Sequence, residues 1–263
     1  MKITLQQNQT FIYTGGKALQ AQRPTIVFIH GAQQDHSCWA LQSRWFAYHG
    51  FNVLAPDLPV HGSSQGEPLT SIQAMSAWLV SLLDELAIPA AHLVGHSMGS
   101  LIALETALHD AQRVTSLGLI GTSLPMPVSN ALLDAAKDNE PLAASLINQW
   151  SYSARAQLGG SAVPGLWLLG MNQQLMQRQQ QGVFAVDLQA CNHYQRDLND
   201  LAQLTLPVLL LAGNQDKMTS PKVLGALEKA IPKAQLVLLK GAGHALMAEQ
   251  PDAVLDQLRH FIQ

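Results

Sequence analysis

Apolar and polar positions divide most of the chain into short β-rich runs that alternate with longer helix-like stretches. Segments 2–6 and 10–14 predict an initial antiparallel hairpin. The buried strands predicted after it are 25–30, 52–55, 92–94, 114–120, 207–212 and 235–239. The predicted helices are 38–49, 70–87, 99–109, 221–230 and 251–262, the last two opened by prolines. This order predicts an α/β fold, with a mostly parallel, eight-stranded twisted sheet flanked by helices.

One interval, residues 122–200, interrupts the alternation. It contains no clear buried strand, is rich in Leu, Met, Gln and Trp, and is broken by four prolines. A loop of that length without structure of its own is rare in a compact domain, so helices are expected there. The sequence therefore predicts a helical cap at 122–200 and a core made of 1–121 and 201–263. Within the cap, the Gln-rich piece 171–182 is typical of a solvated helix face.

Composition narrows the possible partners. The 263 residues are 48% apolar and 13% charged, enough to bury a large core as one domain. The net charge of -3 comes without a long run of Lys or Arg, which argues against nucleic acid and anionic membranes. The N-terminus lacks a signal-peptide pattern, and no segment approaches the roughly 18 apolar residues of a membrane span. We therefore expect a cytoplasmic protein without membrane insertion, a monomer or homodimer, acting on a small neutral or apolar molecule.

Cysteine and histidine usage gives no sign of a metal or cofactor. Cys38 and Cys191 are the only cysteines, which fits two free thiols in a reducing compartment. The ten histidines form no His-Glu-x-x-His pattern, and no Cys-x-x-Cys occurs. We therefore predict chemistry by side chains alone, with no metal and no cofactor.

The candidate chemistry centres on Ser97, in Gly95-His96-Ser97-Met98-Gly99. This segment follows an apolar run and precedes helix-forming sequence, the context of the Gly-x-Ser-x-Gly nucleophile elbow. The glycines leave room where neighbouring chain passes close, and the strained turn exposes the serine hydroxyl. The same five letters also occur by chance in glycine-rich turns. A nucleophile additionally requires an acid and then a histidine downstream, because a serine needs an oriented base.

Two later strand ends supply these partners. Asp216 follows the predicted strand 207–212, and His244 follows 235–239 after a Gly-x-Gly turn. Taken alone, such an Asp is more often a turn residue or helix cap, and such a His a surface residue. Carboxyl ends of parallel strands share one edge of the sheet, so both are expected beside Ser97. There His244 would take the serine proton and Asp216 would orient the imidazole.

Such a reaction also needs two donors for the developing oxyanion and a pocket for the substrate. The predicted donors are the backbone N–H groups of Met98, at a helix N-terminus, and Ala32, in the loop after 25–30. His30 is expected to brace that loop. The candidate residues of an apolar pocket under the cap are Gln33, Trp150, Trp167, Leu168, Met171 and Leu246. Aromatic residues at such spacing also form cap cores, and that interpretation stays open.

Together these motifs resemble those of the α/β-hydrolase family over nearly the whole chain. The segments that carry the resemblance are His30-Gly31 with Trp39, Asp57 to Ser64, Gly95 to Gly99, Gly213 to Asp216, and Gly241 to His244 with Glu249-Gln250-Pro251. The resemblance implies the fold, the triad and a structural role for Asp57 and His61. Val60 departs from the glycine usual in the Asp-x-x-Gly-His-Gly segment, which can alter that loop without touching the triad.

The resemblance also separates the subfamilies. Ser97 differs from the Asp of haloalkane dehalogenases and epoxide hydrolases and from the thiolate of dienelactone hydrolases. His30-Gly31 and Ala245 differ from the His-Thr and Lys of hydroxynitrile lyases, and the short His-Gly-Ala loop differs from the Gly-Gly-Gly type linked to tertiary-alcohol esters. A serine carboxylesterase acting on small to medium acyl esters through an acyl-enzyme is the function implied.

Other functions share these motifs and remain open. Hydrolases of lactones, thioesters or carbon–carbon bonds, acyltransferases and perhydrolases use the same constellation, so the pocket must decide among them. A ligand-binding protein on the same fold is an alternative of a different class. Labelling by a fluorophosphonate probe separates it from an enzyme, because only a competent nucleophile reacts quickly.

Overall fold

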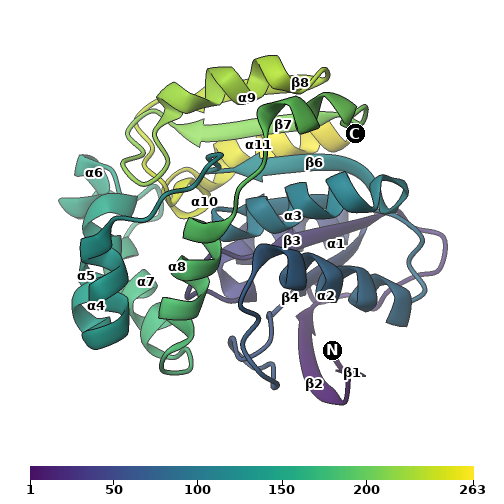
Figure 1. The fold of residues 1–263 in the computed structure, drawn as a ribbon, viewed down its shortest axis with the longest axis horizontal. Helices are drawn as coiled ribbons and strands as arrows, with labels where there is room; N and C mark the ends of the chain where they lie inside the picture. Colours follow the sequence, from purple (N-terminus) through teal and green to yellow (C-terminus); the bar gives the residue numbers. More distant parts are fainter.

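An eight-stranded sheet forms the centre of the protein, whose computed structural model describes residues 1–263 (Figure 1). The strands are β1 (Lys2–Leu5), β2 (Asn8–Tyr13), β3 (Thr25–Ile29), β4 (Asn52–Pro56), β5 (Ala91–His96), β6 (Val114–Ile120), β7 (Val208–Gly213) and β8 (Ala234–Leu239). Their order is β1-β2-β4-β3-β5-β6-β7-β8. The pairs β1–β2 and β2–β4 are antiparallel and all others are parallel. The prediction of a mostly parallel α/β sheet is confirmed.

Two apolar layers cover the sheet, one on each face. The helices that make them are α1 (Ala40–Tyr48), α2 (Ile72–Glu85), α3 (Met98–His109), α9 (Leu224–Ala230), α10 (Leu246–Glu249) and α11 (Pro251–Ile262). Helices α2, α3 and α9 share one core cluster, which includes Trp78 and Leu101. Helices α1, α10 and α11 share the other, with Phe46 and Leu258. Strands buried from both sides read as continuous apolar runs, which is why their sequence pattern predicts them well. The prediction of a buried strand at 235–239 is wrong in one respect, because β8 is an edge strand and only Leu239 within it is buried.

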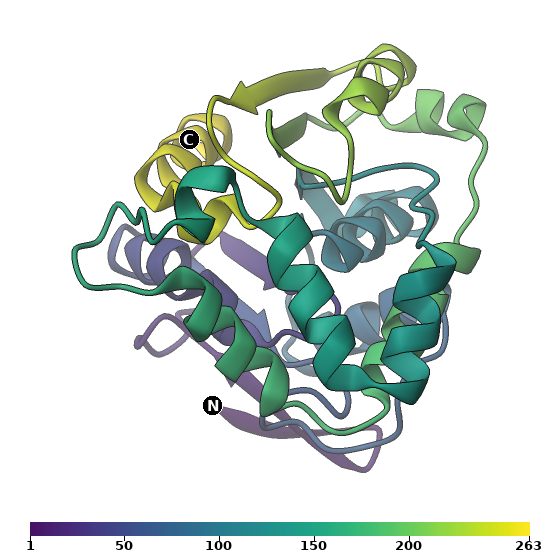
Figure 2. The same ribbon diagram turned by 90° about the vertical axis from the view of Figure 1, so that its left-hand side faces the viewer.

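Between β6 and β7 the chain forms helices and no strand. These helices are α4 (Asn130–Asp138), α5 (Glu140–Ser151), α6 (Ala154–Gln157), α7 (Leu168–Gln177) and α8 (Val183–His193). Figure 2 shows them spread over one side of the molecule, and in Figure 1 the arrowheads of β6 and β7 point toward that side. They have a small apolar cluster of their own, which includes Leu132, Leu175 and Phe184. The helices expected within 122–200 are present, and the division into core and cap stays a prediction.

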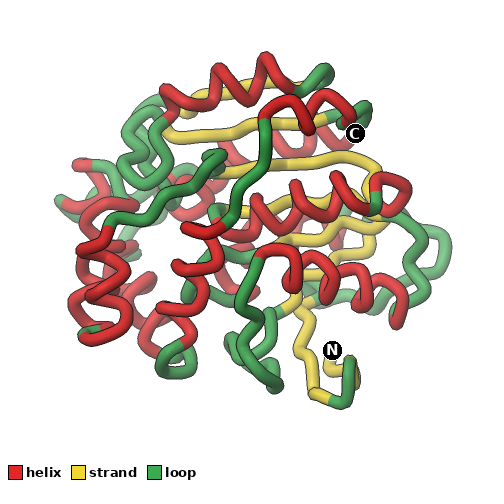
Figure 3. The backbone as a smooth tube through the Cα atoms, in the orientation of Figure 1, coloured by secondary structure: helices red, strands yellow, loops and turns green.

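Short 3₁₀ turns also occur between the main elements, and Figure 3 colours helices, strands and loops separately along the backbone. These turns are His36–Trp39, Ala111–Arg113, Leu198–Gln203 and Pro221–Val223. The first precedes α1 because the Asp35 carboxylate accepts the Ser37 N–H and closes a tight turn there. Helix α10, directly after His244, has no counterpart among the predicted elements. No helix combines the length and apolar character needed to cross a membrane.

Candidate active site

Ser97 lies at a sharp turn between β5 and α3, with φ 52° and ψ -118°. This backbone conformation is costly for a residue other than glycine, so the surroundings must hold it. A Cβ at Gly95 would lie 2.0 Å from the Gly99 carbonyl oxygen, and one at Gly99 would lie 2.3 Å from the Ile29 oxygen. The Ser97 N–H donates to the Ile120 carbonyl at 2.9 Å, which ties the turn to β6. The two glycines of the motif are therefore required by close backbone approach.

His244 and Asp216 form a buried pair beyond the ends of β8 and β7. Nδ1 of His244 lies 2.8 Å from Oδ2 of Asp216. Oδ1 of Asp216 accepts the N–H groups of Met218 and Thr219 at 2.8 Å each, and the Thr219 hydroxyl donates to Oδ2 at 2.6 Å. Burial alone would raise the pKa of Asp216, but His244 and Thr219 outweigh it and lower that pKa. The carboxylate stays ionised and fixes the imidazole with Nε2 free to act as a base.

Ser97 and His244 line one small cavity of about 50 Å³, together with Ala32 and His96. We call it the small cavity. No hydrogen bond joins the Ser97 hydroxyl to His244 in this structure. The structure thus brings Ser97, Asp216 and His244 from three strand ends to one edge of the sheet, as the order of the motifs predicts.

Ala32 and Met98 bring two backbone N–H groups to the same place. Ala32 lines the small cavity, and its N–H has no acceptor within the protein. Met98 follows Ser97 as the first residue of α3, so its N–H has no partner in its own helix. The N-terminus of α3 adds partial positive charge there. This arrangement can stabilise negative charge that develops beside the Ser97 hydroxyl.

Two buried histidines fix the loops around the site. The Leu58 N–H donates to Nε2 of His30 at 3.1 Å, so Nδ1 of His30 donates to the Gly31 carbonyl at 2.9 Å. Burial, aided by the nearby His61, lowers the pKa of His30 to about 4. His96 contacts the His244 carbonyl through Nε2 at 3.0 Å, and burial lowers its pKa to about 3. Both rings are therefore neutral and hold the loops by hydrogen bonds. The role of His96 could not be predicted, because it occupies an unspecified position of the Gly-x-Ser-x-Gly motif.

A larger cavity of about 410 Å³ adjoins the small one and also contains Ser97 in its wall. We call it the large cavity. Its wall comes from the segment between β6 and α4, from α4, α5 and α8, and from the loops after β3 and β7. The residues beyond the predicted ones are Met126, Pro127, Val128, Ser129, Leu132, Leu188, Cys191, Lys217, Met218 and Thr219. Of the predicted pocket residues, Trp150 alone lies on this wall.

The other five residues predicted for the pocket lie outside both cavities. Trp167 and Met171 face solvent, with exposed fractions of 65% and 44%. Leu168 packs into a small cluster with Tyr152, and Leu246 is fully buried in the core that α1 and α11 share. Gln33, in the same loop as Ala32, is buried, and its side chain donates to the Met176 carbonyl. None of the five lies on a cavity wall. For Leu168 and Met171, both on α7, apolar spacing along the helix did not show which face meets the cavity.

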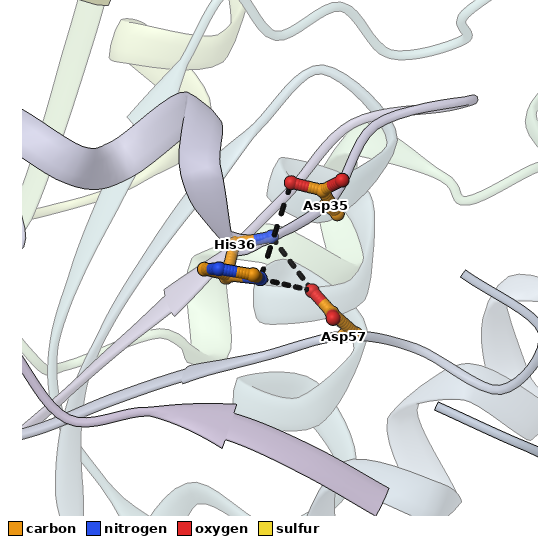
Figure 4. A group of neighbouring side chains, drawn as sticks. All are labelled: Asp35, His36 and Asp57. Atoms are coloured by element: carbon orange, nitrogen blue, oxygen red, sulfur yellow. Dashed lines mark hydrogen bonds and ion pairs between the residues drawn. The ribbon is translucent and has the colours of Figure 1, made fainter. Parts of the chain in front are cut away.

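Asp35, His36 and Asp57 form a compact polar group, within 4.8 Å of one another (Figure 4). Oδ1 of Asp57 accepts both the backbone N–H and Nδ1 of His36, at 2.8 Å each. Oδ2 of Asp35 accepts from Arg178 at 2.8 Å and from Gln179 at 2.9 Å. The carboxylates are thus occupied by N–H donors. The group ties the loops after β3 and β4 to the end of α7 and does not present a free ligand set for a metal.

Replacing Asp35 by Asn is expected to lower the free energy of unfolding by about 2 kcal/mol at pH 7. Burial alone would raise the pKa of Asp35, but hydrogen bonds from Ser37, Gln179 and Arg178 lower it from 3.8 to about 2. A depressed pKa stabilises the fold above pH 3.8, and this contribution disappears as the pH falls through 2. Urea unfolding at several pH values measures the difference between the two proteins.

The exposed Asp138 has no hydrogen-bond partner and provides the control, Asp138→Asn. It is expected to leave the free energy of unfolding at pH 7 unchanged. An Asp35→Asn protein as stable as the wild type at pH 7 would contradict the stabilising role of the carboxylate.

Comparisons with known proteins extend this description. The chain matches the model described as "Alpha/beta hydrolase family" over residues 26–257. The dihydrolipoyllysine-residue acetyltransferase component of the acetoin cleaving system of Cupriavidus necator is 38% identical over 97 residues, covering 36% of this chain and 26% of that protein. This chain therefore spans only about a quarter of that relative's length.

Two further relatives are covered over most of their length. The 2-hydroxy-6-oxononadienedioate/2-hydroxy-6-oxononatrienedioate hydrolase of Cupriavidus pinatubonensis is 29% identical over 238 residues, covering 84% of this chain and 80% of that protein. The structure of the enol-lactonase from Burkholderia xenovorans LB400 matches with a TM-score of 0.87 at 22% identity, covering 100% and 99% of the two chains. At that identity the structural match concerns the fold alone.

Proposed function

The chain belongs to the alpha/beta hydrolase family, and from that premise we propose that it is a serine hydrolase that cleaves carboxylic esters of small to medium acyl chains. One observation carries the proposal. The His244 imidazole, oriented by the buried Asp216 carboxylate at 2.8 Å, lines the same cavity as Ser97 on its strained turn. This is the constellation that activates a serine hydroxyl toward a carbonyl carbon.

The reaction proceeds through an acyl-enzyme. The Ser97 hydroxyl gives its proton to Nε2 of His244 while Oγ bonds to the ester carbonyl carbon. The carbonyl oxygen becomes an oxyanion, which the N–H groups of Ala32 and Met98 stabilise. Collapse of this intermediate expels the alcohol, which takes the proton from His244 and leaves the acyl group on Ser97. Water then attacks by the same route, releases the carboxylic acid and restores the serine.

The large cavity supports the substrate class. Its volume of about 410 Å³ is near the lower end of typical ligand pockets, which favours short and medium acyl groups. Most of the lining side chains are apolar, and Lys217 is the one charged residue among them. An apolar acyl chain loses no favourable hydration when it enters such a cavity, whereas a highly charged substrate would lose its hydration there.

Hydrolysis of a carbon–carbon bond is a second candidate. The observation that favours it is the 29% identity to the hydrolase of Cupriavidus pinatubonensis over 84% of this chain. That chemistry uses the same family of motifs, so the choice between the two depends on the substrate that the cavity admits.

A series of p-nitrophenyl esters from acetate to palmitate tests the proposal. We expect turnover to be highest for the short and medium chains, and we expect Val128→Phe to lower kcat/KM for the longest accepted chain more than for acetate. The reason is that Val128 lines the large cavity and a phenyl ring there shortens it. Val163→Phe is the matched control, because Val163 is exposed and does not line this cavity.

The proposal fails if the wild type turns over no ester in the series. Labelling of Ser97 by a fluorophosphonate probe then separates the remaining functions. A labelled but inactive protein has a competent nucleophile for another acyl class or acceptor, and an unlabelled protein is a binding protein on this fold.

A further inference from the structure

Asp187, on α8, is a fully buried carboxylate that the reaction described above does not use. Its Oδ2 accepts two hydrogen bonds, one from the Gln33 N–H at 2.9 Å and one from Nε2 of His61 at 2.9 Å. Gln33 directly follows Ala32, and His61 lies in the loop after β4. One cap side chain therefore joins the helices of 122–200 to two loops of the core, and one of those loops carries the proposed oxyanion donor.

His61 is placed to be positively charged in this contact. Its Nδ1 faces the Pro59 carbonyl at 3.0 Å and its Nε2 faces the Asp187 carboxylate, so both ring nitrogens meet acceptors. Only the imidazolium donates from both nitrogens. Burial would lower the pKa of His61, but Asp187 outweighs it and raises that pKa, with a smaller contribution from Asp57. The neutral His30 ring is the remaining titratable neighbour, with ring centroids 4.9 Å apart.

The backbone that Asp187 holds is strained. Gln33 has a φ of 55°, a region that costs energy for a residue with a side chain. The Gln33 N–H belongs to the peptide plane that contains the Ala32 Cα, so fixing this N–H fixes the position of Ala32. The Gln33 side chain is held as well, by a hydrogen bond from Nε2 to the Met176 carbonyl at 3.1 Å. Contacts from the cap therefore impose the loop geometry, which Gln33 would not adopt by its own preference.

Helix α8, which carries Asp187, also lines the two cavities. Leu188, next to Asp187, contributes to the walls of both. A second hydrogen bond joins the loop after β4 to the segment before α8, where the Gly62 N–H donates to Oε1 of Gln179 at 2.7 Å. Helix α8 thus contacts the place where the acyl chain would lie and, one residue earlier, the loop beside it.

From these contacts we propose that Asp187, paired with His61, is a positioning residue that holds Ala32 where its N–H meets the oxyanion. This inference rests on the proposed function, since it assigns Asp187 a part in that same reaction. Asp187 does not touch the substrate and acts through the 32–33 peptide. An oxyanion donor works only when it is aimed at the transition state in advance, so a small displacement of Ala32 weakens the chemical step more than substrate binding.

The test is Asp187→Asn, which preserves size but removes the charge that holds His61. We expect kcat on a p-nitrophenyl ester to fall about 10- to 100-fold while KM changes by less than about threefold. The affinity for a trifluoromethyl ketone, which forms a tetrahedral adduct with its oxygen in the oxyanion site, should fall in parallel with kcat/KM. A merely structural role would leave the ratio of ketone affinity to KM unchanged.

Glu105→Gln is the matched control. Glu105 is also a fully buried carboxylate and binds Tyr194 and Arg196, just after α8, away from the oxyanion loop. We expect it to lower the thermal midpoint without changing kcat or ketone affinity. His61→Gln is the second variant and keeps the proposal testable if Asp187→Asn does not fold. The amide still donates to Asp187 but lacks the positive charge, so kcat should fall by less than in Asp187→Asn.

The inference is overturned if Asp187→Asn folds and changes kcat and ketone affinity no more than Glu105→Gln does, or if His61→Gln leaves both unchanged. In either case the active, fluorophosphonate-labelled wild type leaves the proposed function standing. A wild type that is neither labelled nor active overturns both.

Discussion

Ser97→Ala is expected to lower kcat for ester hydrolysis by roughly 10⁵- to 10⁶-fold, since loss of the nucleophile leaves only binding and the oxyanion donors. The stability of the fold should change little. The Ser97 hydroxyl makes no hydrogen bond within the protein, and alanine keeps the same backbone at φ 52°. Single-turnover kinetics with p-nitrophenyl butyrate, together with a thermal unfolding curve, measure the two effects separately.

Ser116→Ala provides the control for this variant. Ser116 lies on β6, where its hydroxyl bonds Nδ1 of His92 at 2.8 Å, remote from both cavities. Its activity should stay within a few-fold of the wild type. An Ser97→Ala protein that folds normally and retains a tenth of the activity would show that another group attacks the substrate.

Asp216→Asn is expected to lower kcat by about 10⁴-fold. Oδ1 of Asp216 accepts the N–H groups of Met218 and Thr219, so an amide oxygen will occupy that position and turn its NH₂ group toward His244. A donor facing Nδ1 favours the tautomer with hydrogen on Nε2, which cannot take the proton of Ser97. The kcat of the purified variant, compared with that of Asp138→Asn, tests this expectation.

The loss of activity in Asp216→Asn can be distinguished from a general loss of structure. Asp216→Asn should still bind a trifluoromethyl ketone weakly and keep a native circular dichroism spectrum, because the amide preserves the two backbone contacts. Activity within tenfold of the wild type would mean that Asp216 does not orient the base, and a different carboxylate would have to be sought.

Much of the core could be predicted from the sequence because buried parallel strands are short, continuous apolar runs. The runs 114–120 and 207–212 correspond to β6 and β7 almost residue for residue. The positions of Ser97, Asp216 and His244 followed from the same logic, since the carboxyl ends of parallel strands meet at one edge. At these three positions the residue type and its place after a strand both indicate the same site, so the sequence predicts their location.

The substrate wall and the contacts of Asp187 could not be predicted in the same way. Leu188 lines both cavities because of how α8 is rotated against the sheet, and helical periodicity does not determine that rotation. Asp187 carries no local motif, and its partner Gln33 lies 154 residues away. For His61, the family resemblance implied a structural role in its loop without indicating a charged partner on α8.

The backbone at Ser97 has a consequence for how this chain could change over many generations. A φ of 52° costs a serine about 1–3 kcal/mol, whereas a glycine would adopt it freely and lose about 0.5–1 kcal/mol through its flexible unfolded state. If the Ser97 hydroxyl were not needed, a glycine here would make the folded protein more stable. The backbone preference at this turn therefore opposes serine, and only a need for its hydroxyl would favour it there.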